Sequence, residues 1–414
     1  MADRRVVVTG TGVVTPLGCS VDRFWDDLIS GKSGIRPVER FDSTGFDVHF
    51  GGECLDFDTA GVIETKAARR MDRFSQMALV AADQAVRQSG FDVSAVDPVR
   101  VGCTIGSGIG GIKELEDQYR RLLEKGPDKV SAFTIPKLMV NAAAGNVSIA
   151  IGAKGPSQAV STACASGTNA LGDAFHWIRR GMVDVMVSGG AEAALTPLGL
   201  SAFAAMKALS TRNDDPPTAS RPFDRSRDGF VLSEGAGILV LEELEFARRR
   251  GAEILAEITG FGSTCDAGHL TAPDEDGAGA ARAMEVALAD ARLNPDDVQY
   301  INAHATGTPL GDVAECYAVR KVFGPRGDGV AVSSTKASIG HLLGASGAVE
   351  LVACIQAIRH SVAPATITLE NPDEGCCEVR HLKGSAQDMP IERAMNNSFG
   401  FGGHNACIIV SKYR

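Results

Sequence analysis

The 414-residue chain contains no run of about eighteen or more apolar residues, the length that a helix needs to cross a membrane. Its first residues, MADRRVVVTG, lack the apolar segment and cleavage site of a secretory signal. No Cys-x-x-Cys pair occurs among the ten cysteines, and the adjacent Cys376 and Cys377 suit neither zinc ligation nor an easy disulfide. These absences favour a cytoplasmic protein in a reducing compartment, with no membrane span and no metal site.

Positive charge is also scarce. The chain has 41 Lys and Arg residues against 51 Asp and Glu residues, which gives a net charge of −10. Nucleic-acid binding requires a basic footprint, so this balance argues against it. A local basic patch that faces an acidic partner remains compatible with the composition.

Short apolar runs alternate with amphipathic segments along the whole chain. Strands are predicted over 5–10, 100–106, 183–190, 237–244, 253–262, 298–304, 330–335 and 405–411. Helices are predicted over 74–90, 112–125, 165–180, 276–292, 311–323 and 345–360. This alternation predicts an α/β protein with a largely buried sheet. The polar, turn-rich segment 212–229 is predicted to be a long surface loop.

The two parts of the chain resemble each other weakly. A strand ends in STACASG near residue 160 and in SSTKASIGHLLGASG near residue 332, and a helix follows each. Strands that run into glycine-rich turns, VVVTGTGVV and LAEITGFGS, open both parts. We infer a duplicated α/β unit with halves 1–250 and 251–414, and we expect an active site between them.

Cys164 lies in VSTACASGTNAL, where a strand gives way to a helix. Small residues permit a tight turn and a close approach of the backbone to a ligand. The positive end of the helix favours a thiolate, and the free N–H groups of the first turn can bind an oxyanion. A cysteine that merely packs where only small residues fit explains the segment equally well when it is considered alone.

Three other segments carry polar residues that could act with this thiol. His304 follows one apolar strand in NAHATGTP, and Lys336 and His341 follow another in STKASIGHLLGASG. Each could be a structural histidine or a solvated lysine, but the ends of successive strands in an α/β sheet are where ligand sites form. Phe401 lies between glycines in NNSFGFGGHNA, which is either a mobile loop with an accessible N–H or a turn before the last strand.

Together, VSTACASGTNAL, INAHATGTP, SSTKASIGHLLGASGA and NNSFGFGGHN resemble the condensing enzymes of fatty-acid synthesis, in particular the elongating β-ketoacyl-acyl-carrier-protein synthases of type II. The resemblance covers nearly the whole chain. It implies a thiolase-like α/β fold, with duplicated αβαβα layered halves and mixed five-stranded sheets. It also implies a decarboxylative Claisen condensation of an acyl-enzyme with malonyl-acyl carrier protein, which releases CO2 and a 3-oxoacyl-acyl carrier protein.

The resemblance assigns the catalytic roles. Cys164 would be the nucleophile, and the N–H groups of Cys164 and Phe401 would form its oxyanion hole. His304 and His341 would be neutral and would each donate a ring N–H to the malonyl thioester oxygen. Lys336 would be a fixed cation near His341 and not a base.

The resemblance also implies residues that support the site and bind the substrate. Glu315 would be the charge partner of Lys336. Thr306 and Thr308 would line the pantetheine channel, and the acyl tunnel would be lined by Ile109, Phe203 and Phe401. His404 stands where many relatives have threonine, which leaves the chain-length preference open.

A homodimer and an acidic acyl carrier protein are the partners that the resemblance implies. Basic positions that match the docking face of the family are Lys66, Arg69, Arg70, Lys129 and Lys207, although a solvated helix surface explains the same charges. No organic cofactor is implied. A structural monovalent cation would lie near Asn302, Glu350, Asn397 and Ser398.

Parts of the sequence also resemble proteins of other functions. A dehydrogenase is suggested by the GxGxxG of Gly106, Gly108 and Gly111, but no second strand with a terminal acid follows within about 20 residues. A thiolase does not use two donor histidines, and an initiating synthase has asparagine in place of His341. A non-catalytic chain-length factor lacks the cysteine. A polyketide ketosynthase remains open, although the lack of fused domains favours fatty-acid synthesis.

Overall fold

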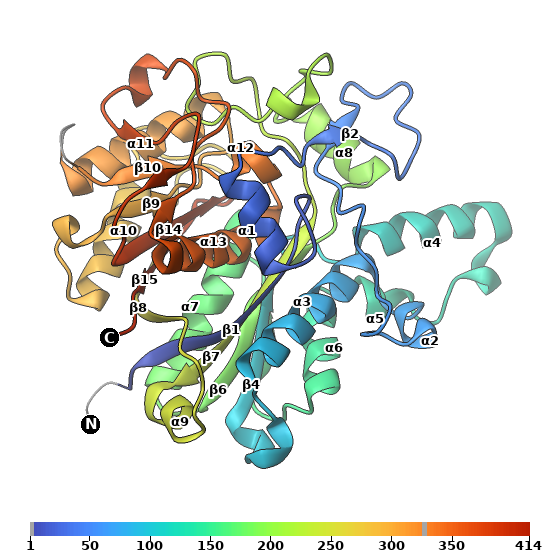
Figure 1. Ribbon diagram of the computed structural model, residues 1–414. Helices are drawn as coiled ribbons and strands as arrows, with labels where there is room; N and C mark the ends of the chain where they lie inside the picture. Colours follow the sequence, from blue (N-terminus) through green and yellow to red (C-terminus); the bar gives the residue numbers. More distant parts are fainter. Residues whose placement is uncertain (1–3, 325–328) are drawn as a thin grey trace.

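A computed structural model describes residues 4–324 and 329–414, so residues 1–3 of the first predicted half lie outside it (Figure 1). In the described part of the N-terminal half, five strands pair in the order β5-β4-β6-β7-β1. The β5/β4 and β4/β6 pairs are parallel, whereas β6/β7 and β7/β1 are antiparallel. These strands are β1 (Val6–Val14), β4 (Val101–Gly106), β5 (Ser157–Val160), β6 (Val185–Glu192) and β7 (Gly235–Glu243).

The C-terminal half repeats this arrangement over its described residues. Its order is β10-β9-β14-β15-β8, again with two parallel pairs followed by two antiparallel pairs. The strands are β8 (Ala256–Cys265), β9 (Tyr300–Asn302), β10 (Ala331–Ser333), β14 (Arg393–Gly400) and β15 (His404–Ser411). Antiparallel pairing of β1 with β8 joins the two halves, and β12 (Arg380–His381) extends the far edge. The predicted duplicated thiolase-like fold with mixed five-stranded sheets is thereby confirmed.

Helices form three layers around these sheets. Helices α3 (Arg73–Ser89) and α6 (Ala142–Ile151) cover the outer face of the first half, and α10 (Ala278–Ala291) and α11 (Pro309–Phe323) cover that of the second. Between the halves lie α7 (Ser166–Arg179) and α13 (Ser346–His360), which contact each other and the strands of both sheets.

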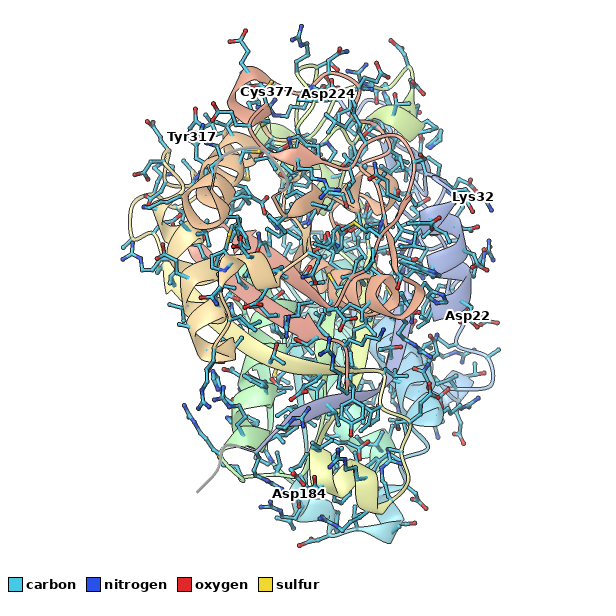
Figure 2. All side chains as sticks on the ribbon, turned by 60° about the vertical axis from the view of Figure 1, so that its left-hand side comes forward. Asp22, Lys32, Asp184, Asp224, Tyr317 and Cys377 are labelled. Carbon is cyan, nitrogen blue, oxygen red and sulfur yellow. The ribbon has the colours of Figure 1, made fainter. Side chains whose placement is uncertain are left out.

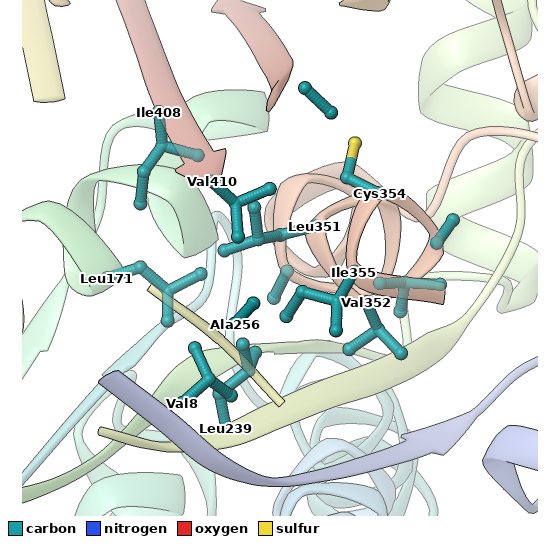
Figure 3. Close-up of a cluster of buried hydrophobic side chains, with 14 of the residues drawn as sticks. Val8, Leu171, Leu239, Ala256, Leu351, Val352, Cys354, Ile355, Ile408 and Val410 are labelled. Carbon is teal, nitrogen blue, oxygen red and sulfur yellow. The ribbon is translucent and has the colours of Figure 1, made fainter. Parts of the chain in front are cut away.

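Helix α13 is apolar almost all round because it lies in this central layer. Every residue from Ser346 to Ile358 is buried, as expected of a helix that is enclosed on all sides. Figure 3 shows Leu351, Val352 and Ile355 of α13 beside Val8 of β1 and Leu239 of β7. The core between the halves therefore fixes the position of the N-terminus of α13, next to the site described below.

The remaining elements are short or peripheral. They are β2 (Arg36–Pro37), β3 (Phe50–Gly51), β11 (Val362–Ala363), β13 (Gln387–Asp388), α1 (Val21–Ile29), α2 (Thr65–Ala68), α4 (Ile112–Lys125), α5 (Thr134–Leu138), α8 (Pro197–Ala205), α9 (Leu244–Arg249) and α12 (Lys336–Ile339). Helices α4 and α5 project to one side with α2 (Figure 1). Within the described residues, none of the helices is both long and apolar enough to cross a membrane.

Each predicted strand and helix is present, with ends shifted by a few residues. Strand β14 is absent from the predicted strands, and its last part falls in the segment that is predicted to be a loop or turn. Its central residues Asn396, Asn397 and Ser398 are polar yet fully buried, so the strand lacks the apolar pattern that identifies a buried strand.

The segment 212–229 is only partly the surface loop that its polar composition predicts: residues 212–218 are exposed or half-buried, whereas residues 219–224 are buried. Phe223 and Asp224 are buried, and Figure 2 places Asp224 at the same end of the molecule as Cys377. The Asp224 carboxylate accepts hydrogen bonds from the N–H groups of Ser226, Glu370 and Asn371. Polar side chains are buried here because each one meets a partner, which a composition-based prediction does not detect.

Candidate active site

Cys164 lies in a single 3-10 turn, Ala163–Ala165, between β5 and α7. Ala163 has a left-handed φ of +49°, and Ser166 closes the turn by accepting from Thr162 N–H at 2.9 Å and donating to the Ala163 carbonyl at 2.6 Å. A Cβ on Gly400 would come within 3.0 Å of the Cys164 nitrogen, so only glycine lets the end of β14 approach. The cysteine therefore stands immediately before a helix, as the sequence indicates.

The C-terminal half contains the same turn. Leu343, with φ also +49°, precedes Gly344 at the start of α13. Ser346 accepts from the Leu342 N–H at 2.9 Å, just as Ser166 accepts from Thr162. The weak sequence repeat thus reflects a repeated structure, in which Gly344 occupies the position of Cys164.

His341 is the nearest ionisable neighbour of the thiol. Its Nε2 lies 3.0 Å from the Cys164 sulfur, and its Nδ1 lies 2.9 Å from Ser346 Oγ. Because Ser346 Oγ already accepts from Leu342 N–H, its own hydrogen can be donated to Nδ1. That arrangement leaves the ring proton on Nε2, which faces the sulfur.

His304 faces His341 across the site. The ring centroids are 5.3 Å apart at an angle of 83°. The backbone N–H groups of His304 and Ala305 donate to the Glu315 carboxylate at 2.9 and 2.7 Å, and Asn397 donates to the same carboxylate at 3.0 Å. Glu315 of α11 therefore fixes the backbone that carries His304.

The expected pairing of Lys336 with Glu315 is wrong. Lys336 Nζ makes an ion pair with Glu350 of α13, and both side chains are completely buried. Glu350 lies on the first turns of α13 and faces α12, so packing of these two helices creates the pair. Glu315 is instead occupied by backbone and amide N–H groups.

Both histidines are held in the neutral form. Burial lowers the pKa of His304 and of His341 well below the ordinary value, and the nearby Lys336 charge lowers both further. A neutral imidazole can donate one N–H without carrying charge into the reaction. The electrostatics thus suit two hydrogen-bond donors aimed at an oxygen that becomes negative.

Replacing Lys336 by methionine is expected to lower the free energy of unfolding by about 3–5 kcal/mol, because Glu350 would be left buried without its counter-charge. Chemical denaturation would measure this change. The double variant K336M/E350Q removes both charges and should recover most of the loss. Equal stability of wild type and K336M would contradict the pairing.

The free thiol is not poised as a thiolate in the way the sequence suggests. Burial raises the pKa of Cys164 to about 12, although Lys336 and the N–H groups of Phe401 and Cys164 itself oppose that rise. The two N–H groups act on the sulfur, so they lie beside the attacking atom, and an oxyanion hole requires donors aimed at the carbonyl oxygen next to it. The His341 Nε2–H also faces the sulfur, so it can donate a hydrogen bond that stabilises the thiolate as it attacks a substrate.

A pocket of about 530 Å³ opens beside the cysteine. It is mostly apolar, and Phe203 and Phe230 meet edge to face at 5.4 Å in its wall. The hydroxyl oxygens of Thr306 and Thr308 lie 3.1 Å apart. The predicted residues that line this pocket are Ile109, Cys164, Phe203, Lys207, His304, Thr306, Thr308, Glu315, His341 and Phe401, whereas Lys336 lies behind it.

The donor atoms of Cys164, His304 and His341 lie within 4.8 Å of one another, so they could also chelate a soft metal ion. A second group of atoms suits a hard cation. Asn397 Oδ1 and Glu350 Oε2 are buried without a hydrogen-bond partner among the described residues, as is Asn396 Oδ1. Asn302 and Ser398 of the expected cation site are engaged, with the Glu350 carbonyl and with Thr168 respectively.

The predicted docking residues all lie at the surface. Lys66 and Arg69 are exposed on α2 and at its end, and Arg70 stacks over Phe133 at 4.7 Å. Lys129 is exposed in the turn after α4, and Lys207 is exposed at the rim of the pocket. Their neighbour Arg73 is different, because it pairs with the buried Glu234.

Three residues of the site were not predicted from sequence. Ser346 orients His341, Phe399 packs edge-on to His304 with centroids 5.9 Å apart, and Glu192 binds the backbone behind the pocket. The Ala-Ser-Gly shared by CASG (164–167) and GASG (344–347) is the one signal that could have identified Ser346.

Comparison with known proteins identifies the class to which this fold and site belong. Residues 3–247 match the profile of the beta-ketoacyl synthase N-terminal domain, and residues 255–370 match that of the C-terminal domain. The chain belongs to the beta-ketoacyl synthase family.

Within that family, the chain is similar to proteins named 3-oxoacyl-[acyl-carrier-protein] synthase 2. The protein from Synechocystis is 48% identical over 99% of both chains, and that from Vibrio cholerae is 48% identical over 100% of both. A beta-ketoacyl synthase from Burkholderia phymatum has a TM-score of 0.92 at 36% identity, covering 99% of this chain and 100% of that one. The ishigamide ketosynthase/chain length factor has a TM-score of 0.93 at 33% identity, with full coverage of both chains.

Proposed function

We propose that this protein elongates fatty acids by condensing an acyl group held on Cys164 with malonyl-acyl carrier protein. The observation that carries this proposal is the cluster of Cys164, His304 and His341, whose reactive atoms lie within 4.8 Å at the base of an apolar pocket. Full-length similarity to 3-oxoacyl-[acyl-carrier-protein] synthases supports it.

The first half-reaction transfers the acyl group. The Cys164 sulfur attacks the thioester carbonyl of the acyl-carrier protein, a C–S bond forms, and the carrier thiol leaves. The N–H groups of Cys164 and Phe401 face the sulfur and so lie where they can stabilise the oxyanion. The chain is then held in the apolar pocket as a thioester.

The second half-reaction forms the carbon–carbon bond. The malonyl carboxylate leaves as CO2, and its bonding pair passes to the enolate, whose oxygen accepts the N–H groups of His304 and His341. The enolate carbon attacks the acyl-Cys164 carbonyl, and the tetrahedral intermediate collapses to release the sulfur. Neutral histidines suit this step because their pKa values are held low by burial and Lys336.

The experiment that tests the proposal supplies acyl- and malonyl-carrier protein to the purified protein. Stoichiometric CO2 and a 3-oxoacyl product two carbons longer are expected. Absence of both from a folded preparation would overturn the proposal. Retention of activity after treatment with a chelator would count against a catalytic metal at Cys164, His304 and His341.

A polyketide ketosynthase is the second candidate, because one similar structure is a type II polyketide ketosynthase bound to its acyl carrier protein and a hexaketide. That structure has a TM-score of 0.91 at 34% identity. Supplying malonyl-carrier protein without a ketoreductase distinguishes the two. A single extension supports fatty-acid elongation, whereas several unreduced extensions support polyketide synthesis.

The proposed carrier-protein docking surface consists of Lys66, Arg69, Arg70, Lys129 and Lys207. Reversing Arg69 and Arg70 to glutamate is expected to raise KM for carrier-bound substrate about tenfold, because each reversal opposes an acidic partner. The KM for a small acyl thioester should not change. Steady-state kinetics with both substrates measures this, and R180E/K412E, which reverses two exposed charges elsewhere, is the control. Equal effects on both substrates would argue against docking here.

A homodimer is also part of the proposal. Strand β5 is the outermost of the described strands on its side, so one of its edges is free to pair. Apolar residues are exposed on the adjoining helices, with Leu123 of α4 at 69%, Ile135 of α5 at 61% and Ile149 of α6 at 82%. Exposed apolar groups of this kind favour a protein interface.

Replacing Ile149 by glutamate is expected to shift the protein from dimer to monomer at micromolar concentration, because the new charge would be buried in the interface. Light scattering after size-exclusion chromatography measures the mass. The control is Leu310→Glu, which alters another exposed apolar residue, 64% exposed, in α11. A dimer that is unaffected by I149E would place the interface elsewhere.

The proposal further includes a structural monovalent cation at the unpaired oxygens of Glu350 and Asn397. These atoms lie behind Lys336 and His304, so such an ion would support the site without touching substrate.

A further inference from the structure

Glu192 is a buried carboxylate that the reaction above does not use. It ends strand β6, and its side chain is completely buried. In the first loop of the site, Ser107 Oγ donates to it at 2.8 Å and the N–H groups of Gly108, Ile109 and Gly110 donate at 2.6, 3.2 and 3.2 Å.

A fifth donor comes from the other half of the molecule. The Gly344 N–H, in the turn that precedes α13, lies 3.2 Å from Glu192 Oε2. Because all five neighbours donate, the side chain acts as a carboxylate, which only accepts. Burial raises the pKa of Glu192, and the hydrogen bonds from Ser107 and the backbone oppose that rise.

The two loops that meet at this carboxylate form one wall of the pocket. Gly108 and Ile109 line it from the N-terminal half, and Leu343 lines it from the C-terminal half. Glu192 binds the backbone of both loops from the side away from the pocket. The wall therefore consists of two separate pieces that a single side chain holds together.

The loop at Gly108 and the turn at Gly344 pack with almost no free space between them. A Cβ on Gly344 would lie 2.6 Å from the Gly108 nitrogen and 2.8 Å from Glu192 Oε2. One on Gly190 would lie 2.4 Å from the Gly344 carbonyl. Neither loop can move toward the other, so the carboxylate determines how far apart they stand.

We propose that Glu192 is a specificity-determining positioning residue, which holds Ile109 and Leu343 as one rigid wall and so limits the length of the acyl chain that Cys164 accepts. This inference rests on the proposed condensing function. Without the carboxylate, a longer acyl chain can displace Ile109 at a lower cost in free energy. Selectivity then shifts toward longer substrates.

The carboxylate also acts on the nucleophile through its charge. Glu192 raises the pKa of Cys164, whereas Lys336 lowers it. Removing the charge should therefore move alkylation of Cys164 to lower pH. A role in folding alone would not cause that shift, so it separates positioning at the site from general stability.

The principal test is Glu192→Gln, which replaces one acceptor oxygen by an NH2 group that confronts N–H donors. Acylation of Cys164 is measured by mass spectrometry with saturated acyl thioesters of a small thiol, from six to sixteen carbons. The ratio of kcat/KM for the longest to the shortest accepted chain is expected to rise about tenfold. The pH midpoint for iodoacetamide modification of Cys164 should fall.

Glu53→Gln is the matched control, since Glu53 is a buried carboxylate that accepts from the N–H groups of Glu39 and Arg40, neither of which lines the pocket. If E192Q does not fold, Ser107→Ala removes one donor only and should change the length profile in the same direction by a smaller factor. An unchanged profile in the folded variant, or the same change in E53Q, would overturn the inference. Failure of the wild type to acylate at all would overturn the proposed function instead.

Discussion

Cys164→Ala is expected to lower acyl transfer and condensation by about 10⁴- to 10⁶-fold, because no other nucleophile takes the place of its sulfur. Decarboxylation of malonyl-carrier protein should continue, since His304, His341 and Lys336 are unchanged. Parallel assays of acyl-enzyme by mass spectrometry and of CO2 from labelled malonyl groups measure the two activities separately.

The control for this variant is Cys103→Ala, which removes another buried thiol, in strand β4. It should leave both activities close to those of the wild type. Condensation that survives in Cys164→Ala would show that the acyl group is held elsewhere, and loss of decarboxylation in that variant would show that CO2 release also requires the sulfur.

His304→Ala is expected to slow decarboxylation about 10²- to 10³-fold, the usual effect of losing one donor to a developing oxyanion. Acylation of Cys164 should be nearly unaffected, because the imidazole in contact with the sulfur is that of His341, whose Nε2 is 3.0 Å away. Rapid-quench measurement of acyl transfer and CO2 release separates the two steps.

His341→Ala provides the comparison for that result. Its ring touches the sulfur and also faces His304, so both half-reactions should slow in this variant. If His304→Ala impaired acylation as strongly as decarboxylation, the division of tasks between the two histidines would be wrong.

His304 and His341 were predictable because they follow the apolar strands β9 and β10, which are neighbours in the sheet. Cys164 follows β5, a short and partly exposed strand at the other end of the strand order, and its signal was the small-residue turn before a helix. The partner of Lys336 was not predictable in the same way. Glu350 is 14 residues further along, and only the packing of α12 against α13 brings the two side chains together.

Burial of polar groups accounts for the other differences between expectation and structure. Asn396 and Asn397 made an inner strand resemble a turn, and Asp224 lies within a segment that reads as solvent-exposed. The burial of Glu192 could not be predicted either, because a glutamate at the end of a predicted strand is common and is usually exposed. Its five donors come from residues 107–110 and from Gly344, which lies 152 positions away.

The turns at Ala163 and Leu343 have the same shape, but only the turn of the N-terminal half can carry the nucleophile. A side chain in place of Gly344 would collide with the Gly108 nitrogen and with Glu192, so a second nucleophile cannot arise there by a single substitution. One turn carries the reactive thiol, and the other carries the glycine that lies against Gly108 and Glu192. The symmetry of the fold is therefore broken at the position of the nucleophile.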